Sequence, residues 1–167
     1  PQSVRMLDFE QLVRFGGFPE PVLKHNVRFF NRWKRNRLKL LFREELRDVT
    51  RVHEVGQVEL LAEFIRQHSG QLLNYASLAR KIRASQDSVR RWIEVLESLY
   101  YCFLIRPWTK NLTRSLLKEP KIYLTDWSLL DNPGVRFENM VGCHLLKAVT
   151  WWQDLGLGEY CLHFLRT

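Results

Sequence analysis

The sequence predicts a mainly α-helical fold with a small β component. Apolar residues recur at helical spacing through most of the 167 residues, two helices flank a tight turn near the middle, and two aliphatic and aromatic runs follow them. Hydrophobic residues make up 46% of the chain, which is enough to form a packed core and argues against wholesale disorder. We expect three segments, residues 1–70, 71–126 and 127–167.

The first segment is predicted to be helical. Residues 7–15 carry apolar side chains at helical spacing, and two glycines and two prolines within residues 16–21 are expected to end that helix. A long helix is predicted over residues 27–52, and a shorter amphipathic helix over residues 55–67.

The predicted helix over residues 27–52 has a basic stripe opposite an apolar stripe. Its cations recur every three or four residues: Arg28, Arg32, Arg35, Lys39, Arg43, Arg47 and Arg51. Such a stripe is typical of the solvated face of an amphipathic helix. It is also compatible with contact to a phosphate backbone or to an acidic partner.

The second segment begins with the pattern of a helix-turn-helix. A short helix over residues 75–82 is followed by a tight turn and by a longer helix from residue 86 to about residue 100. The hydroxyl of Ser85 can accept a hydrogen bond from the free N–H groups that begin the longer helix, so Ser85 is the expected N-cap.

Two strands are expected after these helices, over residues 101–105 and 121–125, joined by a basic stretch. A helix-turn-helix followed by a two-stranded ribbon is the element order of a winged helix. Two amphipathic helices joined by a turn also occur in other folds, and many winged helices bind proteins instead of DNA.

Basic and polar side chains of this segment are the candidate nucleic-acid contacts. The chain has 26 Lys plus Arg against 18 Asp plus Glu, and this net charge of +8 favours an anionic partner, most often nucleic acid. The candidates lie at the start of the longer helix and along the wing: Gln86, Ser88, Arg90, Arg91, Arg106, Lys110, Arg114 and Lys118. We expect docking on the phosphates of duplex DNA with few base-specific contacts. Asp87 and Glu94 on the same helix face would repel phosphates.

The sequence disfavours several other classes of protein. Its three cysteines, Cys102, Cys143 and Cys161, are odd in number and widely spaced, which argues against a disulfide framework, and no pair has metal-ligand spacing. We therefore expect a reducing, cytoplasmic compartment. The longest apolar run, residues 99–105, is too short to span a bilayer, and no membrane partner is expected. Because the sequence has no Gly-rich phosphate loop, this chain alone is not expected to hydrolyse ATP.

The third segment is expected to begin a new α/β unit. A helix is predicted over residues 135–149 and a strand over residues 159–166. One face of the helix is apolar, with Phe137, Val141, Leu145 and Val149. An aromatic surface is expected around Trp108, Trp127, Trp151 and Trp152. This surface supports an alternative function, a protein-interaction or self-assembly module that does not bind DNA. The chain opens with Pro1 and finishes in a predicted strand, so we expect a piece of a longer protein.

Five short motifs stand in an order that resembles a known family. They occupy residues 17–20, 47–48, 85–97, 120–126 and 137–139. Together they resemble the C-terminal part of predicted AAA-type ATPases of bacteria and archaea, over essentially the whole chain. In that family a nucleotide-binding core precedes a helical lid-like segment and a winged helix. A domain of unknown function with a restriction-endonuclease-like fold follows.

This resemblance implies roles for three residues. Gly17 and Pro19 match an element that approaches the nucleotide in the helical lids of related NTPases. Glu138 matches an early helix glutamate of the nuclease-like fold, whose other carboxylates hold Mg²⁺ on strands that would follow this chain. Glu138 is therefore a remnant at most, and neither a catalytic site nor a metal site is expected here. The resemblance implies ATP and Mg²⁺ for the parent protein, with its own N-terminal ATPase core as a partner and a homo-oligomer as a further expectation.

Overall fold

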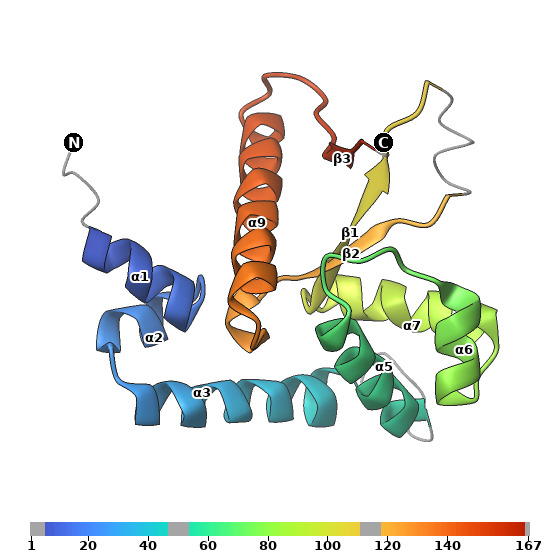
Figure 1. Ribbon diagram of the computed structural model, residues 1–167, viewed down its shortest axis with the longest axis horizontal. Coiled ribbons are helices and arrows are strands. Elements are labelled where there is room, and N and C mark those ends of the chain that lie inside the picture. The colour runs from blue at the N-terminus through green and yellow to red at the C-terminus, as the bar shows by residue number, and fades with distance from the viewer. Residues whose placement is uncertain (1–5, 47–53, 111–117, 166–167) are drawn as a thin grey trace.

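The chain folds into a mainly helical structure with one small sheet, as the sequence predicts. The computed structural model describes residues 6–46, 54–110 and 118–165 (Figure 1). Its helices are α1 (Met6–Phe15), α2 (Pro19–Lys24), α3 (Val27–Leu40), α5 (Val55–Gln67), α6 (Tyr75–Ile82), α7 (Gln86–Ser98) and α9 (Pro133–Asp154). Its strands are β1 (Cys102–Pro107), β2 (Lys121–Leu124) and β3 (His163–Phe164). A π-helical turn, η1 (Leu41–Glu45), continues α3, and a 3-10 turn, η3 (Trp127–Leu129), follows β2.

Helix α2 lies where the sequence predicts only a break between helices. Both prolines fall in its first turn, with Pro19 at the helix start. A proline there loses no hydrogen bond, because the first N–H groups of a helix have no partner within the helix. The glycine pair does end the preceding helix α1, because Gly16, directly after Phe15, has a φ of +85°.

Helix α3 makes up most of the predicted helix over residues 27–52, and residues 47–52 lie outside the described part. The side chain of Asn26 caps it by accepting a hydrogen bond from the Phe29 N–H at 2.9 Å. Phe30 is the buried side chain of α3, and the helix runs along one border of the molecule, joining α1 and α2 to the α5–α7 group (Figure 1).

Helices α5, α6 and α7 form the main core together with the sheet. The structure confirms Ser85 as the N-cap of α7, because its hydroxyl accepts a hydrogen bond from the Ser88 N–H at 3.0 Å. Helical spacing predicts a buried face of Val89, Trp92, Ile93, Leu96 and either Leu99 or Tyr100. The first four are in the core, whereas Leu99 is only half-buried. The helix ends at Ser98, slightly before the predicted end, and Tyr100 is 76% exposed.

The sheet has the order β2-β1-β3. Strand β1 pairs antiparallel with β2, from Cys102 opposite Leu124 to Ile105 opposite Lys121, and parallel with β3. A single bridge joins Leu72, ahead of α6, to Lys121. Strand β3 is much shorter than the predicted strand over residues 159–166, because only its contact with β1 keeps it extended.

Helix α9 covers one face of the sheet and exposes its apolar stripe. Gly142 packs on the rings of Tyr123 and Phe103, and Cys143 and Leu146 pack beside it. The face predicted to be apolar points away from the sheet, with Phe137 48%, Val141 40% and Leu145 49% exposed. The prediction that Trp127 belongs to an exposed aromatic surface is wrong, because this side chain is buried in η3.

Candidate nucleic-acid interface

A groove of about 490 Å³ separates α7 from the β1–β2 hairpin and from the start of α6. Its lining includes four of the predicted contact residues: Gln86, Arg90, Arg106 and Lys118. Helix α7 carries the first two of these, and the β1–β2 hairpin supplies the other two. The fold therefore brings predicted contact residues from α7 and from the β1–β2 hairpin together around one concave surface.

The first turn of α7 faces solvent, but its polar groups are not equally free to bind a ligand. Gln86 is exposed at the edge of the groove. Ser88 is tied to the cap, because its N–H donates to the Ser85 oxygen and the two hydroxyl groups lie 3.0 Å apart. Gln86 is thus better placed than Ser88 to reach a nucleic-acid base.

The adjacent arginines of α7 point to different partners. The Arg90 guanidinium lies 4.1 Å from the centre of the Tyr75 ring and lines the groove. Arg91 lies outside the groove lining and donates to both carboxylate oxygens of Glu54 at 2.9 Å. Glu54 also accepts from the Trp92 indole at 2.9 Å, so Arg91 is part of a structural ion pair.

Carboxylates share the groove with the cations. Glu94, Glu97 and Glu119 line it beside Arg90, Arg106 and Lys118. Burial raises the pKa of Glu97, which accepts a hydrogen bond from the Leu104 N–H at 3.1 Å. The groove therefore has mixed charge, and its cations lie toward the α7 start and the hairpin.

The remaining wing candidates lie apart from this groove. Lys110 follows β1 and is exposed, but it is not part of the lining. Arg114 lies outside the described residues. Tyr75, which supports Arg90, was not singled out in the sequence; an aromatic residue at the start of a helix gives no signal of its own.

Gly17, one of the two residues with an implied nucleotide role, lies against Trp127, whereas Pro19 is exposed at the start of α2. A Cβ atom on Gly17 would lie 2.7 Å from Cη2 of Trp127, so the backbone packs directly on the indole. The same indole donates to the Leu12 carbonyl at 3.1 Å. The glycine motif and the motif at residues 120–126 therefore pack on each other within this chain.

Glu138 and Asn139 link α9 to strand β2. Glu138 accepts from the Tyr123 hydroxyl at 2.9 Å and pairs with Lys121 at 3.4 Å. Asn139 is fully buried; it accepts from the Leu124 N–H and the Ser69 hydroxyl and donates to the Leu124 carbonyl. In the described part of the chain, no group of three His, Cys, Asp or Glu side chains is placed to hold a metal.

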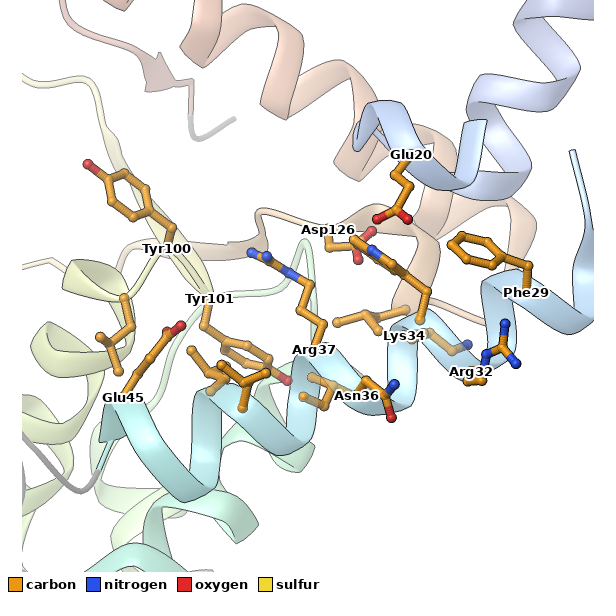
Figure 2. Close-up of a pocket in the computed structure, with 16 residues that line it drawn as sticks. Glu20, Phe29, Arg32, Lys34, Asn36, Arg37, Glu45, Tyr100, Tyr101 and Asp126 are labelled. Carbon is orange, nitrogen blue, oxygen red and sulfur yellow. The ribbon is translucent and has the colours of Figure 1, made fainter. Parts of the chain in front are cut away.

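A second cavity, of about 420 Å³, lies between α3 and the segments that follow α7 and β2. Arg37 projects from α3 into this space toward Asp126, with Phe29 and Tyr100 at opposite ends (Figure 2). Trp33, Arg32 and Lys34 also line it. The basic stripe of this helix is evident in the sequence, but no sequence signal indicates a cavity beside it.

A family model described as "Domain of unknown function (DUF8612)" matches residues 6–132, from α1 through η3. The chain belongs to this family. The DUF8612 match covers both the groove and the cavity beside α3, as well as the packed glycine and tryptophan motifs.

Curated relatives of this DUF8612 chain include uncharacterized proteins of Mycobacterium bovis and Mycobacterium tuberculosis. Each is 32% identical over 66 residues, which is 40% of this chain and 15% of the relative. The chain thus matches only a small part of the length of these relatives. No solved structure matches it significantly. Among the described helices, none has the length and apolar character needed to cross a membrane.

Proposed function

We propose that this chain is a nucleic-acid docking module that contacts duplex DNA through α7 and the β1–β2 hairpin. The observation that carries the proposal is the convergence of Arg90, Arg106 and Lys118 on one groove beside the exposed first turn of α7. The order of α5, α6, α7 and an antiparallel hairpin also supports a winged helix.

Docking in this proposal is electrostatic. Arginine and lysine side chains neutralise phosphates and release counterions, which gives affinity without base recognition. Ser88 is engaged in the cap, so any base contact falls to Gln86 and Arg90. Glu94, Glu97 and Glu119 oppose phosphate approach along the rest of the groove, which favours weak and strongly salt-dependent binding.

Fluorescence anisotropy of a labelled duplex, titrated at several salt concentrations, tests this proposal. Three phosphate contacts give a slope of about −3 for log affinity against log salt. Arg90→Ala should weaken binding and reduce the slope by about 1, whereas Arg91→Ala should change it little because Arg91 is paired with Glu54. Lys147→Ala, on exposed α9 surface, is the matched control. Absence of binding at low salt, or equal loss with the control, would rule the proposal out.

The resemblance to AAA-type ATPases supports two further proposals. An ATPase core of the parent protein would bind ATP and Mg²⁺ and control docking by this chain, and the protein would act in the cytoplasm. If so, duplex DNA should change the ATPase rate of the complete protein, and Arg90→Ala should reduce that change.

Self-association is a second candidate function, supported by the exposed apolar face of α9. Trp152 is 43% exposed and continues the stripe of Phe137, Val141 and Leu145. Trp151, 59% exposed, lies beside this stripe on the side of Leu146 and Lys147. A contiguous exposed apolar patch of this kind is typical of an interaction surface. Sedimentation velocity over a range of concentrations tests it: a second copy of the chain as partner predicts oligomers that Leu145→Glu dissolves. A monomer at all concentrations would exclude this function.

A further inference from the structure

Helix α3 carries a row of cations with no acidic neighbours on the helix. It holds six Lys or Arg residues and neither Asp nor Glu. Arg28, Arg32, Arg35 and Lys39 follow one another at steps of three or four, so like charges adjoin along one side. No cation of α3 forms an ion pair with any described carboxylate. An anion along this side would relieve the repulsion between these side chains.

The cavity of Figure 2 meets this row at Arg32, which belongs both to the row and to the cavity lining. Arg28, Arg35 and Lys39 lie outside the lining, on the side of α3 that turns away from Trp33 and Arg37. Aromatic rings from α3 and from the turn between α7 and β1 also line the cavity: Phe29, Trp33, Tyr100 and Tyr101. Its volume of about 420 Å³ is within the range of small-ligand sites, roughly 300–1,000 Å³.

Two of the three carboxylates that line this cavity have a hydrogen-bond or ion-pair partner within the chain. Asp126 is buried and accepts from the Ser128 hydroxyl at 2.6 Å, and Glu20 pairs with Lys24 at 3.3 Å. Glu45 lies at the end of the cavity nearest Tyr100 (Figure 2). Arg32, Lys34 and Arg37 therefore dominate the remaining charge beside the Phe29 end.

Tyr100 is held in an unusual position at one end of the cavity. Its φ is +53°, directly after the C-cap of α7, where the left-handed conformation usually selects glycine. A bulky side chain in this conformation is strained. Even so, the ring is 76% exposed, so packing does not explain why a tyrosine occupies the position. A strained and exposed aromatic ring beside a cavity is a feature of binding sites.

We propose that α3 and this cavity bind single-stranded nucleic acid, with phosphates along the Arg28–Lys39 row and an unpaired base against the ring of Tyr100. Single-strand binding combines a row of cations with aromatic rings on which bases stack. Both are present here, and Arg32 is shared by the row and the cavity that the rings line. The cations alone would also suit an acidic polypeptide, but such a partner makes no use of the exposed ring. This site is separate from the α7 groove and does not depend on it.

Anisotropy with fluorescein-labelled oligothymidylate and oligouridylate of equal length tests the site and separates DNA from RNA. Binding should weaken as salt rises. Arg32→Gln combined with Arg35→Gln should reduce the salt slope by about 1.4. Arg14→Gln combined with Lys147→Gln removes the same charge from exposed positions outside the row and should leave affinity within twofold.

Tyr100→Gly separates binding from folding. Glycine relieves the positive φ, so the thermal midpoint should stay unchanged or rise, while loss of base stacking should weaken single-strand binding roughly 5- to 150-fold. Tyr100→Phe keeps the ring and should bind like the unchanged protein.

Three results would overturn the proposal. They are no binding of either oligonucleotide at low salt, unchanged affinity in both the α3 and the Tyr100→Gly variants, and equally tight binding of labelled polyglutamate that Tyr100→Gly does not affect. Loss of duplex binding in Arg90→Ala with single-strand binding intact would show that the two sites act separately.

Discussion

Gly17 lies directly against the Trp127 indole, where a methyl group has no room. Gly17→Ala would place Cβ 2.7 Å from Cη2 of the indole, and we expect it to lower the free energy of unfolding by about 1–3 kcal/mol. Urea denaturation followed by circular dichroism measures this change. Gly56→Ala is the control, because nothing lies within 4 Å of its added Cβ and alanine favours the α5 helix. Equal stability of both variants would mean that Gly17 is required by something other than this packing.

Asn139 has a structural role beside Glu138, the residue matched to the nuclease-like fold. Asn139→Ala removes both hydrogen bonds to the Leu124 backbone from a fully buried site and should cost about 1–3 kcal/mol of unfolding free energy. Glu138→Gln alters only a half-exposed ion pair and should cost at most about 1 kcal/mol. Thermal denaturation of the two variants checks this order. A larger cost for Glu138→Gln than for Asn139→Ala would show that the glutamate contributes more to stability than the asparagine.

Asp126 makes stability depend on pH. Burial raises the pKa of its carboxyl above the ordinary value of 3.8, so the folded state holds the proton more tightly than the unfolded state. Stability is therefore lost as pH rises from the ordinary pKa through the raised one. Asp126→Asn should remove this loss. In urea denaturation, the free energy of unfolding of the variant should therefore rise relative to that of the unchanged protein between mildly acidic and neutral pH. Asp131, whose pKa the Arg66 hydrogen bond lowers, has the opposite sign and serves as the control.

Among the helices and strands, the sequence correctly predicts those whose bounds depend on residues close together in the chain. Helices α5 and α6 follow their predicted bounds and α7 begins where predicted, because apolar spacing and the Ser85 cap act within a few residues. The sequence does not predict α2, because its two prolines indicate a helix break unless they fall in the first turn of a helix, as they do here. Strand β3 was predicted too long because its extent depends on pairing with β1, which lies far away in the sequence.

The orientation of α9 shows a limit of periodicity. Helical spacing correctly groups Phe137, Val141 and Leu145 on one face, but it does not say which face the rest of the chain covers. The sheet instead meets the side with Gly142, a residue small enough for the close approach of Tyr123 and Phe103. The candidate contacts show the same limit, because the sequence could not reveal that Glu54 engages Arg91 but not Arg90.

This orientation of α9 predicts unequal effects of substitutions on its two sides. Met140 is buried, so Met140→Ala should cost about 2–5 kcal/mol of unfolding free energy. Leu145 is half-exposed, and Leu145→Lys should change stability by only about 0.5 kcal/mol. Chemical denaturation of both variants provides the comparison. A large cost at Leu145 would place a partner, such as a second copy of the chain, on the exposed face.

Over the whole molecule, the N-terminal helices are joined to the C-terminal part through Trp127. Helix α1 contacts both η3 and α9, and the Leu12 carbonyl accepts the indole hydrogen bond (Figure 1). Residues that lie far apart in the sequence thus share one set of contacts. Because neither part completes this contact alone, we expect the chain to unfold as one cooperative unit.

This expectation can be measured by following thermal unfolding with far-ultraviolet circular dichroism and with tryptophan fluorescence. Two-state unfolding requires that the two transitions coincide. Trp127→Phe removes the hydrogen bond to Leu12 and should cost about 1–2 kcal/mol, with α1 and α2 detaching before the core melts. Trp152→Phe, at an exposed position, should leave the transition unchanged. Separate transitions in the unchanged protein would instead make the N-terminal helices an independent unit, and the Gly17 contact would then contribute little to global stability.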